Sequence, residues 1–305
     1  EAPDVSIFYG RTDELARLED WIVRQQCRVV ALLGMGGMGK TSLSVKLAQH
    51  LQDRFDWAIW RSLRNAPPLT ELLADVLQVL GDEPDLVRSP DRQLSRLMEH
   101  LRNSRGLLVL DNVESILQPG NRAGRYYPEY AGYGTLIESA GETRHQSCLV
   151  ITSREKPKEI AELEGRTLPV RSFVVPGLQP TDGREILKAK GLSGAETGWQ
   201  QLLDRYGGNP LALKIVTTHI QDVFSGNVAE FLSQMDRAVF GDIRDLLEQQ
   251  FDRLFPLECE VMYALAIERE PISLSQLKQT LVSPVSPTDL LEAIDSLTRR
   301  SLVEN

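Results

Sequence analysis

The chain of 305 residues has few cysteines, a deficit of positive charge and no long apolar run, and each shortage excludes a class of protein. Its three cysteines lie far apart, with no histidine at ligand spacing, which excludes a disulfide framework and a zinc site. Free thiols favour a reducing compartment, so we expect a cytoplasmic protein. The 34 Lys and Arg residues against 43 Asp and Glu residues give a formal net charge of −9, which makes nucleic acid an unfavourable partner.

Two further absences concern membranes and export. No apolar run approaches the roughly 20 residues of a membrane-spanning helix, so we expect no membrane span. The sequence opens on Glu1 without a charged leader and apolar stretch, so we expect no targeting signal and a piece of a longer protein. A chain of 305 residues exceeds one typical core, which predicts two or three domains.

The first 175 residues alternate between strand and helix patterns. Short apolar runs predict strands, and they read RVVALL, DWAIWRSL, LLVLD, CLVITS and RSFVV. Strands that alternate with amphipathic helical segments predict a parallel sheet covered by helices over residues 1–175. The strand pattern nearly disappears beyond Pro176. We therefore expect a helical domain over residues 176–240 and a third, helix-rich domain over residues 241–305.

The segment after the first strand carries a phosphate-binding pattern. It fits G-x-x-x-x-G-K-[ST] from Gly34 to Thr41, in a strand-loop-helix setting that favours this reading over a mere connecting turn. Lys40 is expected to bridge the β- and γ-phosphates, and the Thr41 hydroxyl is expected to bind Mg²⁺. Backbone N–H groups and the helix N-terminus supply the remaining attraction for phosphate. The expected contacts of the nucleotide are Gly34, Gly36, Gly37, Met38, Gly39, Lys40, Thr41 and Ser42.

The third strand ends in the residues DNVE, 111 to 114. Asp111 should project from the carboxyl edge of the sheet, so we assign it to the Mg²⁺ shell, through water, with a helix N-cap as a compatible alternative. Many ATPases place a second acid where Asn112 stands, and an amide is a poor proton acceptor. Glu114 is therefore our candidate for the base that activates water. Its alternative role is that of an exposed first-turn glutamate.

Three stretches together resemble the NB-ARC class of P-loop signalling ATPases within the STAND group, and the resemblance covers nearly the whole chain. They read IFYGRTDEL at 7–15, LVITSRE at 149–155 and GGNPLAL at 207–213. The resemblance is particularly close to NB-ARC modules of cyanobacterial proteins that end in β-propeller repeats. It implies an α/β P-loop NTPase domain with a parallel sheet, then a helical domain and a winged-helix domain that is incomplete at its C-terminus.

The resemblance also implies roles for individual residues. The implied nucleotide contacts are Phe8, Tyr9 and Arg11 near adenine and ribose, Arg154 at the γ-phosphate, and Pro210 with its neighbour Leu211 against the nucleotide. It favours ATP over GTP. The family's histidine motif, which contacts ADP from the winged helix, should follow RRSLVE, where the sequence stops. We therefore expect this chain to hold ADP less firmly than a longer one would.

These patterns predict a signal-transduction switch with ATP, ADP and Mg²⁺ as ligands. ATP and ADP would favour different domain arrangements, the ATP state would promote self-association, and sensor and effector domains would lie elsewhere in the full-length chain. Slow hydrolysis, with Asp111, Glu114 and Arg154 as catalytic residues, would reset the switch. The alternatives are a P-loop enzyme with turnover as its purpose and a winged-helix regulator that binds DNA. No second substrate pocket is recognisable, and the acidic charge weakens the regulator reading.

The segment GNRAGRYYPEYAGYG at 120–134 allows two interpretations. Arg122 or Arg125 could enter a neighbouring subunit's site as an arginine finger. The favoured alternative is an ordered surface loop.

Overall fold

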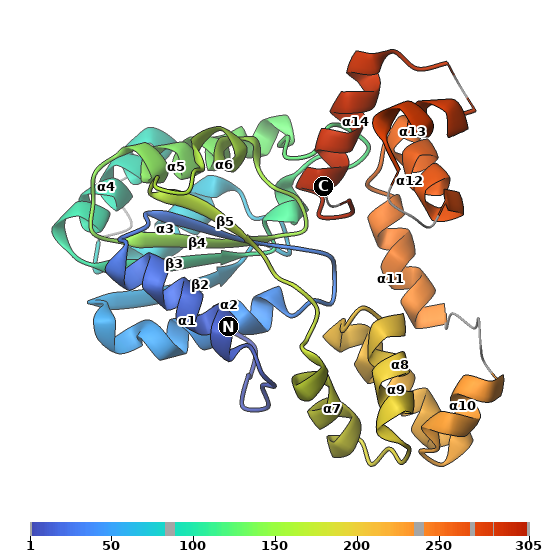
Figure 1. Cartoon of the computed structure of the whole chain (residues 1–305). Helices are drawn as coiled ribbons and strands as arrows, with labels where there is room; N and C mark the ends of the chain where they lie inside the picture. Colours follow the sequence, from blue (N-terminus) through green and yellow to red (C-terminus); the bar gives the residue numbers. More distant parts are fainter. Residues whose placement is uncertain (1, 83–88, 235–240, 269–271, 283, 304–305) are drawn as a thin grey trace.

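The first part of the molecule is built on a five-stranded parallel sheet (Figure 1). The computed structural model describes residues 2–82, 89–234, 241–268, 272–282 and 284–303. The strands are β1 Val29–Leu33, β2 Trp57–Ser62, β3 Gly106–Asp111, β4 Cys148–Ser153 and β5 Val170–Val174. Their order is β2-β3-β4-β1-β5, and every neighbouring pair is parallel. The strands and the parallel sheet predicted from the sequence are confirmed.

Helices cover both faces of this sheet, because successive side chains of a strand point to opposite faces. On β1, Val30 and Leu32 pack toward one layer, while Val29, Ala31 and Leu33 pack toward the other. The first layer contains α1 Thr12–Glu19, the π-helical turn Asp20–Arg24, α2 Lys40–Leu51 and the 3₁₀ turn Gln52–Arg54. The second contains α3 Leu69–Val79, α4 Pro90–Asn103, α5 Ala131–Glu142 after the 3₁₀ turn Pro128–Tyr130, and α6 Lys158–Leu163. All of β1, β3 and β4 is buried.

Beyond residue 175 the described chain forms two groups of helices, each with its own apolar core. The first group is α7 Pro180–Ala189, α8 Glu196–Arg205, α9 Pro210–Phe224 and α10 Val228–Gln234. The second is α11 Gly241–Phe251, α12 Pro256–Glu268, α13 Leu274–Thr280 and α14 Pro287–Arg299. The described residues of the second group hold helices only, so a winged helix stays a prediction. The predicted boundary at residue 240 lies outside the described residues.

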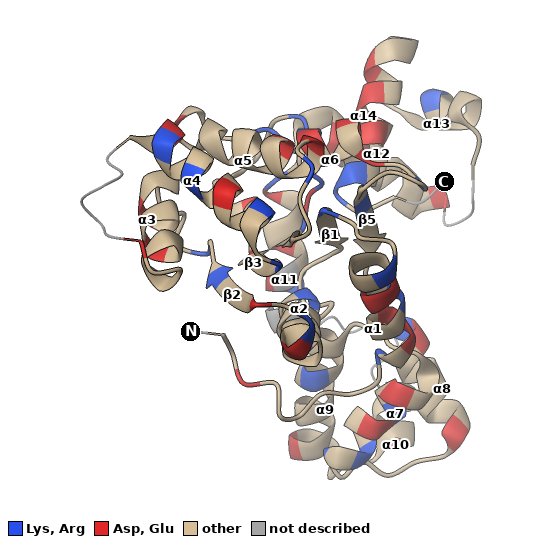
Figure 2. Cartoon of the chain, turned by 90° about the vertical axis from the view of Figure 1, so that its left-hand side faces the viewer, with Lys and Arg blue, Asp and Glu red and all other residues tan. Residues whose placement is uncertain are grey.

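The surface helices mix both signs of charge. Figure 2 shows Lys and Arg interspersed with Asp and Glu along the helices. This agrees with the net charge of −9, which opposes a broad surface for nucleic-acid phosphates. None of the described helices is long and apolar enough to span a membrane.

The segment after β3 packs against α14 of its own chain. The backbone N–H of Ala123 donates to the Ser296 hydroxyl at 2.9 Å, and Arg122 forms an ion pair with Glu292. Arg122 therefore has a partner within the chain, and the structure agrees with the ordered-loop interpretation of this segment.

Candidate functional site

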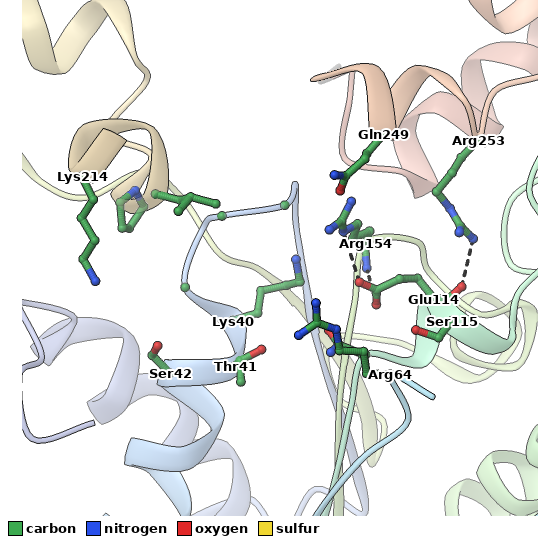
Figure 3. Close-up of a pocket in the computed structure, with 16 residues that line it drawn as sticks. Lys40, Thr41, Ser42, Arg64, Glu114, Ser115, Arg154, Lys214, Gln249 and Arg253 are labelled. Carbon is green, nitrogen blue, oxygen red and sulfur yellow. Dashed lines mark hydrogen bonds and ion pairs between the residues drawn. The ribbon is translucent and has the colours of Figure 1, made fainter. Parts of the chain in front are cut away.

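Strand register brings the loops after β1, β3 and β4 to one edge of the sheet. Leu33 of β1 lies beside Ser153 of β4, and Leu110 of β3 lies beside Ile151. The residues that follow each strand therefore border a common space, because the carboxyl ends of parallel strands lie at one edge of the sheet. A cavity of about 640 Å³ opens there (Figure 3). Its lining residues are Gly36, Gly37, Gly39, Lys40, Thr41, Ser42, Arg64, Asn112, Glu114, Ser115, Arg154, Pro210, Leu211, Lys214, Gln249 and Arg253.

The phosphate loop is held from both sides. Gly37 has a φ of +81°, and a Cβ there would lie 2.7 Å from the Asn209 carbonyl oxygen and 2.8 Å from the Leu211 Cβ, so glycine is required. The Asn209 amide donates to the Gly36 carbonyl at 3.0 Å, while its oxygen caps α9. Asn209 therefore joins the helix that carries Pro210 to the phosphate loop.

Lys40 is the charged centre of the loop. Its ammonium group donates to the Gly34 carbonyl at 2.6 Å and to the Met35 carbonyl at 2.9 Å. Burial lowers the pKa of Lys40 to about 8, with Arg154 acting in the same direction and the carboxylates of Glu114 and Asp111 opposing it. A buried ammonium with only carbonyl partners is a strong attractor for an incoming anion.

Asp111 and Thr41 form a small buried pair beneath the cavity. The Asp111 carboxylate accepts hydrogen bonds from the Thr41 hydroxyl at 2.8 Å and from the Thr152 hydroxyl at 2.6 Å. Burial raises the pKa of Asp111, and these hydroxyl bonds act against that rise. The 3₁₀ helix that follows has Asn112 and not Asp111 at its N-cap position, so the N-cap alternative for Asp111 is wrong.

A short turn of helix follows β3. A 3₁₀ helix spans Val113–Ile116, and Asn112 takes a left-handed conformation with φ of +63°. Asparagine tolerates that conformation better than most residues. Asn112 lines the cavity, and its backbone N–H donates to the Thr152 hydroxyl at 3.0 Å.

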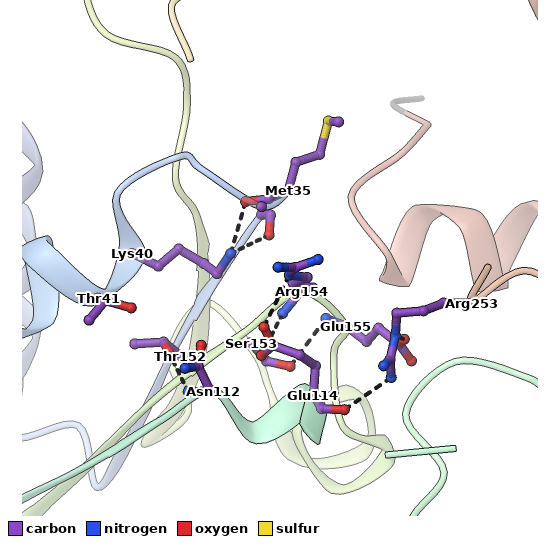
Figure 4. A network of polar contacts seen from close by, with 12 residues as sticks. Met35, Lys40, Thr41, Asn112, Glu114, Thr152, Ser153, Arg154, Glu155 and Arg253 are labelled. Carbon is purple, nitrogen blue, oxygen red and sulfur yellow. Dashed lines mark hydrogen bonds and ion pairs between the residues drawn. The ribbon is translucent and has the colours of Figure 1, made fainter. Parts of the chain in front are cut away.

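Glu114 faces the cavity and not solvent, being 8% exposed. Its carboxylate lies 3.2 Å from Arg154 Nε and accepts from the Arg154 backbone N–H at 3.3 Å (Figure 4). The alternative of an exposed glutamate is therefore wrong. The structure brings the predicted base and the predicted γ-phosphate sensor together as an ion pair.

The predicted adenine contacts lie outside the cavity lining. Phe8 and Met38 pack against the core beneath α1 and α2. Arg11 is buried, pairs with Glu14 at 2.8 Å and donates to the Met38 carbonyl at 3.1 Å, so it supports the phosphate loop from behind. Neither Phe8 nor Tyr9 is among the lining residues. Contacts of this segment with adenine and ribose stay a prediction.

Five lining residues were not predicted from the sequence, and they are Arg64, Ser115, Lys214, Gln249 and Arg253. Lys214 lies one helical turn after Pro210 and points toward the end of α2 that carries Ser42 (Figure 3). The i, i+4 spacing from Pro210 was a signal that could have found it. Gln249 comes from α11 and Arg253 from the turn directly after it, and nothing in the local sequence marks this segment as part of the site.

Arg253 and Arg300 connect the site to the last group of helices. Arg253 forms an ion pair with Glu155 and donates to the Glu114 carbonyl at 3.0 Å (Figure 4). Arg300, which is 2% exposed, reaches the same Glu155 carboxylate at 2.5 Å. Glu155 is 1% exposed and directly follows Arg154, so one short segment contacts both the cavity and the distal helices.

Comparison with known proteins identifies a family match and a relative of the chain. Residues 11–118 match the NB-ARC domain family. Over residues 11–118 the chain carries an NB-ARC domain. Over its whole length it is 51% identical to a WD repeat-containing protein of Nostoc sp.. It spans 25% of the length of that relative.

Two solved structures share the fold of this NB-ARC chain. A Walker-type ATPase of Pyrococcus abyssi is 15% identical with a TM-score of 0.62, over 98% of this chain and 91% of that one. A STAND protein with a tetratricopeptide repeat sensor from Pyrococcus horikoshii is 18% identical with a TM-score of 0.53, over 100% of this chain and 41% of that one. The NB-ARC match ends at residue 118. Arg154 and Pro210 lie beyond it, and the structure places both at the cavity.

Proposed function

We propose that this NB-ARC chain is a switch whose bound nucleotide, ATP or ADP, sets the arrangement of its parts. One observation carries the proposal, namely that a single cavity is lined by all three parts of the chain. The part built on the sheet supplies Lys40 and Glu114, α9 supplies Pro210, and the last group of helices supplies Gln249 of α11 and Arg253 just after it. A ligand in that cavity touches every part, so two ligands that differ by one phosphate stabilise different arrangements.

The residues present fit a Mg²⁺-nucleotide. Thr41 and Asp111 offer neighbouring oxygens, and Asp111 lies below the cavity lining, so it would hold Mg²⁺ through water. No described group of three or more His, Cys, Asp and Glu side chains is arranged to hold a metal ion. This suits Mg²⁺, which is commonly bound by one or two protein oxygens, phosphates and waters. Mg²⁺ would neutralise phosphate charge, while Lys40 and the loop N–H groups orient the phosphates.

The pair of Glu114 and Arg154 gives a physical route to slow hydrolysis. With Arg154 at 3.2 Å the Glu114 carboxylate is engaged in an ion pair. When Arg154 turns to a γ-phosphate, Glu114 is released and can accept a proton from water. Asn112 orients that water through its amide. Hydrolysis thus depends on a side-chain rearrangement, which suits a timer better than a fast enzyme.

The same rearrangement reaches the distal helices through Arg253. Arg253 donates to the backbone carbonyl of Glu114 and pairs with Glu155, the neighbour of Arg154. Movement of either residue alters the contacts of α11. In the longer chain, this change would expose surfaces for self-association and pass the signal to sensor and effector domains.

The identity of the nucleotide released on denaturing the purified chain tests the proposal. We expect stoichiometric ADP or ATP, and ATP turnover well below the usual enzyme range of about 1–10³ s⁻¹. Lys40→Ala should abolish retention of nucleotide. A wild-type chain that retains none and binds neither nucleotide when supplied would refute the switch. Fast turnover stimulated by one metabolite would favour a catalytic P-loop enzyme instead.

A further inference from the structure

The cavity holds more positive charge than its own acids balance. The lining cations are Lys40, Arg64, Arg154, Lys214 and Arg253, whereas Glu114 is the only lining carboxylate among the described residues. Arg154 pairs with Glu114, and Arg253 pairs with Glu155. Arg64 has no ion-pair partner among the described residues, although its backbone N–H donates to the Ser62 hydroxyl at 3.2 Å. Arg64 is an exposed residue of the cavity lining, so its guanidinium is hydrated and available to an incoming anion.

The backbone next to Arg64 is hydrogen-bonded to β3, the strand that ends at Asp111. The N–H of its neighbour Leu63 donates to the Asp111 carbonyl at 2.7 Å, and the Leu63 side chain is fully buried. A turn then closes from Ala66 N–H to the Leu63 carbonyl at 2.8 Å. The Tyr130 hydroxyl donates to the Ala66 carbonyl at 2.9 Å, which anchors the far end of the turn. Arg64 therefore projects from a rigid base beside Asp111.

The position of Arg64 identifies the part of the nucleotide that it meets. Ser62 at the end of β2 lies beside Asp111 at the end of β3, and Arg64, two residues further on, lines the same cavity as Lys40 and Glu114. Figure 3 shows Arg64 on the side of Glu114 and Ser115, whereas Lys214 projects from α9 on the other side of Lys40. Because Lys40 and the acidic strand end mark the terminal phosphates, Arg64 lies on the γ-phosphate side.

We propose that Arg64 binds the terminal phosphate of a nucleoside triphosphate and gives the cavity a preference for triphosphate over diphosphate. This inference rests on the proposed function. A planar guanidinium offers two parallel N–H donors to phosphate oxygens, a geometry that a lysine ammonium does not reproduce. Arg154 must leave Glu114 before it can reach the γ-phosphate. Arg64 has no ion pair to break among the described residues, so it can contact the phosphate before any rearrangement.

Arg61 is a matched control from the same strand end. Its Nε atom pairs with Asp75, and it is not among the lining residues of the cavity. Replacing Arg61 or Arg64 by alanine removes the same chemical group from neighbouring positions. Only the second replacement removes a cation from the cavity.

The test is to measure equilibrium binding of ADP and of a non-hydrolysable ATP analogue, each with Mg²⁺, to the wild-type chain, Arg64→Ala, Arg64→Lys and Arg61→Ala. We expect Arg64→Ala to weaken binding of the ATP analogue by about 10- to 100-fold, the usual worth of a charge-assisted hydrogen bond, with ADP changed less than about twofold. Arg64→Lys should lose part of this preference, and Arg61→Ala should bind both nucleotides as wild type.

Two outcomes would overturn the inference. Equal weakening of ADP and the ATP analogue in Arg64→Ala would place the contact elsewhere on the nucleotide, and unchanged binding of both would mean that there is no contact. Lys40→Ala separates these from failure of the switch itself. If wild type binds both nucleotides, Lys40→Ala binds neither and Arg64→Ala equals wild type, then only the Arg64 inference fails.

Discussion

The buried carboxylate of Glu155 and the guanidinium of Arg253 form an ion pair that joins the segment after β4 to the turn after helix α11. The same carboxylate pairs with a second arginine, Arg300, directly after α14. Glu155 is thus held between two cations of the distal group of helices, while the preceding Arg154 lines the cavity. These ion pairs connect the cavity to the last group of helices.

Glu155→Gln should release the distal helices from the sheet. Removing one member of a buried ion pair leaves charge uncompensated and typically costs about 3–5 kcal/mol. We expect a lower melting temperature, or a separate early transition, measured by calorimetry, together with weaker retention of ADP. Glu162→Gln is the control, because Glu162 is exposed and has no ion pair among the described residues. Equal melting curves for the two variants would contradict this role for Glu155.

Glu114→Gln should slow hydrolysis while nucleotide binding persists. Loss of a general base typically lowers a rate by about 10²–10⁴-fold, and the amide cannot accept the proton from water. The measurement is single-turnover ATP hydrolysis with the bound nucleotide analysed over time. Glu129→Gln, an exposed carboxylate in the loop at 120–134, should hydrolyse ATP as wild type. Hydrolysis at the wild-type rate in Glu114→Gln would assign the base elsewhere.

Asn209→Ala should weaken nucleotide binding in addition to its effect on stability. The side chain caps α9 and donates to the Gly36 carbonyl, so the variant loses a cap, worth about 0.5–2 kcal/mol, and a contact with the phosphate loop. Asn227→Ala is the matched variant, because Asn227 accepts from the Glu230 N–H at the start of α10 and has no described contact with the loop. Both should melt earlier. Only Asn209→Ala should bind ADP more weakly in titration calorimetry, and equal ADP affinities would contradict the loop contact.

Binding of ADP without magnesium should weaken as the pH rises through about 8. Burial lowers the pKa of Lys40 to about 8, so the nucleotide-free chain loses this positive charge above that pH. Phosphate favours the ammonium form, and binding above that pH therefore takes up a proton. We expect the affinity for ADP to fall by up to about tenfold per pH unit above the pKa of Lys40. Well below that pKa Lys40 is fully protonated, so its contribution to the affinity is nearly constant. Calorimetry in buffers of different ionisation enthalpy measures the proton uptake, and no uptake at high pH would contradict it.

The sheet and the phosphate loop were predictable from the sequence, because both depend on local patterns. The apolar runs define the buried strands, and the glycine spacing before Lys40 defines a loop that needs a positive φ at Gly37. Parallel topology also predicts which edge of the sheet carries the site, and Asp111 lies beside Thr41 at that edge as expected.

The rest of the site depends on packing between distant segments. Arg253 lies in the turn after α11 and belongs to no motif, and only the position of this turn at the cavity makes it a lining residue. The pairing of Glu114 with Arg154 was also missed, because each residue was assigned a separate role. Asn209 lies in the stretch GGNPLAL, yet its hydrogen bond to the Gly36 carbonyl depends on how α9 packs against the phosphate loop in the folded chain.

The central claim is that ADP and ATP favour different arrangements of the three parts, and a distance measured across the molecule tests it most directly. Spin labels at Glu99→Cys on α4 and Lys278→Cys on α13, with Cys259→Ser to remove a partly exposed thiol, report on the sheet and the distal helices. We predict that the distance distribution from pulsed electron resonance shifts between the ADP complex and the complex with a non-hydrolysable ATP analogue. Superimposable distributions, with both nucleotides shown to be bound, would contradict the switch.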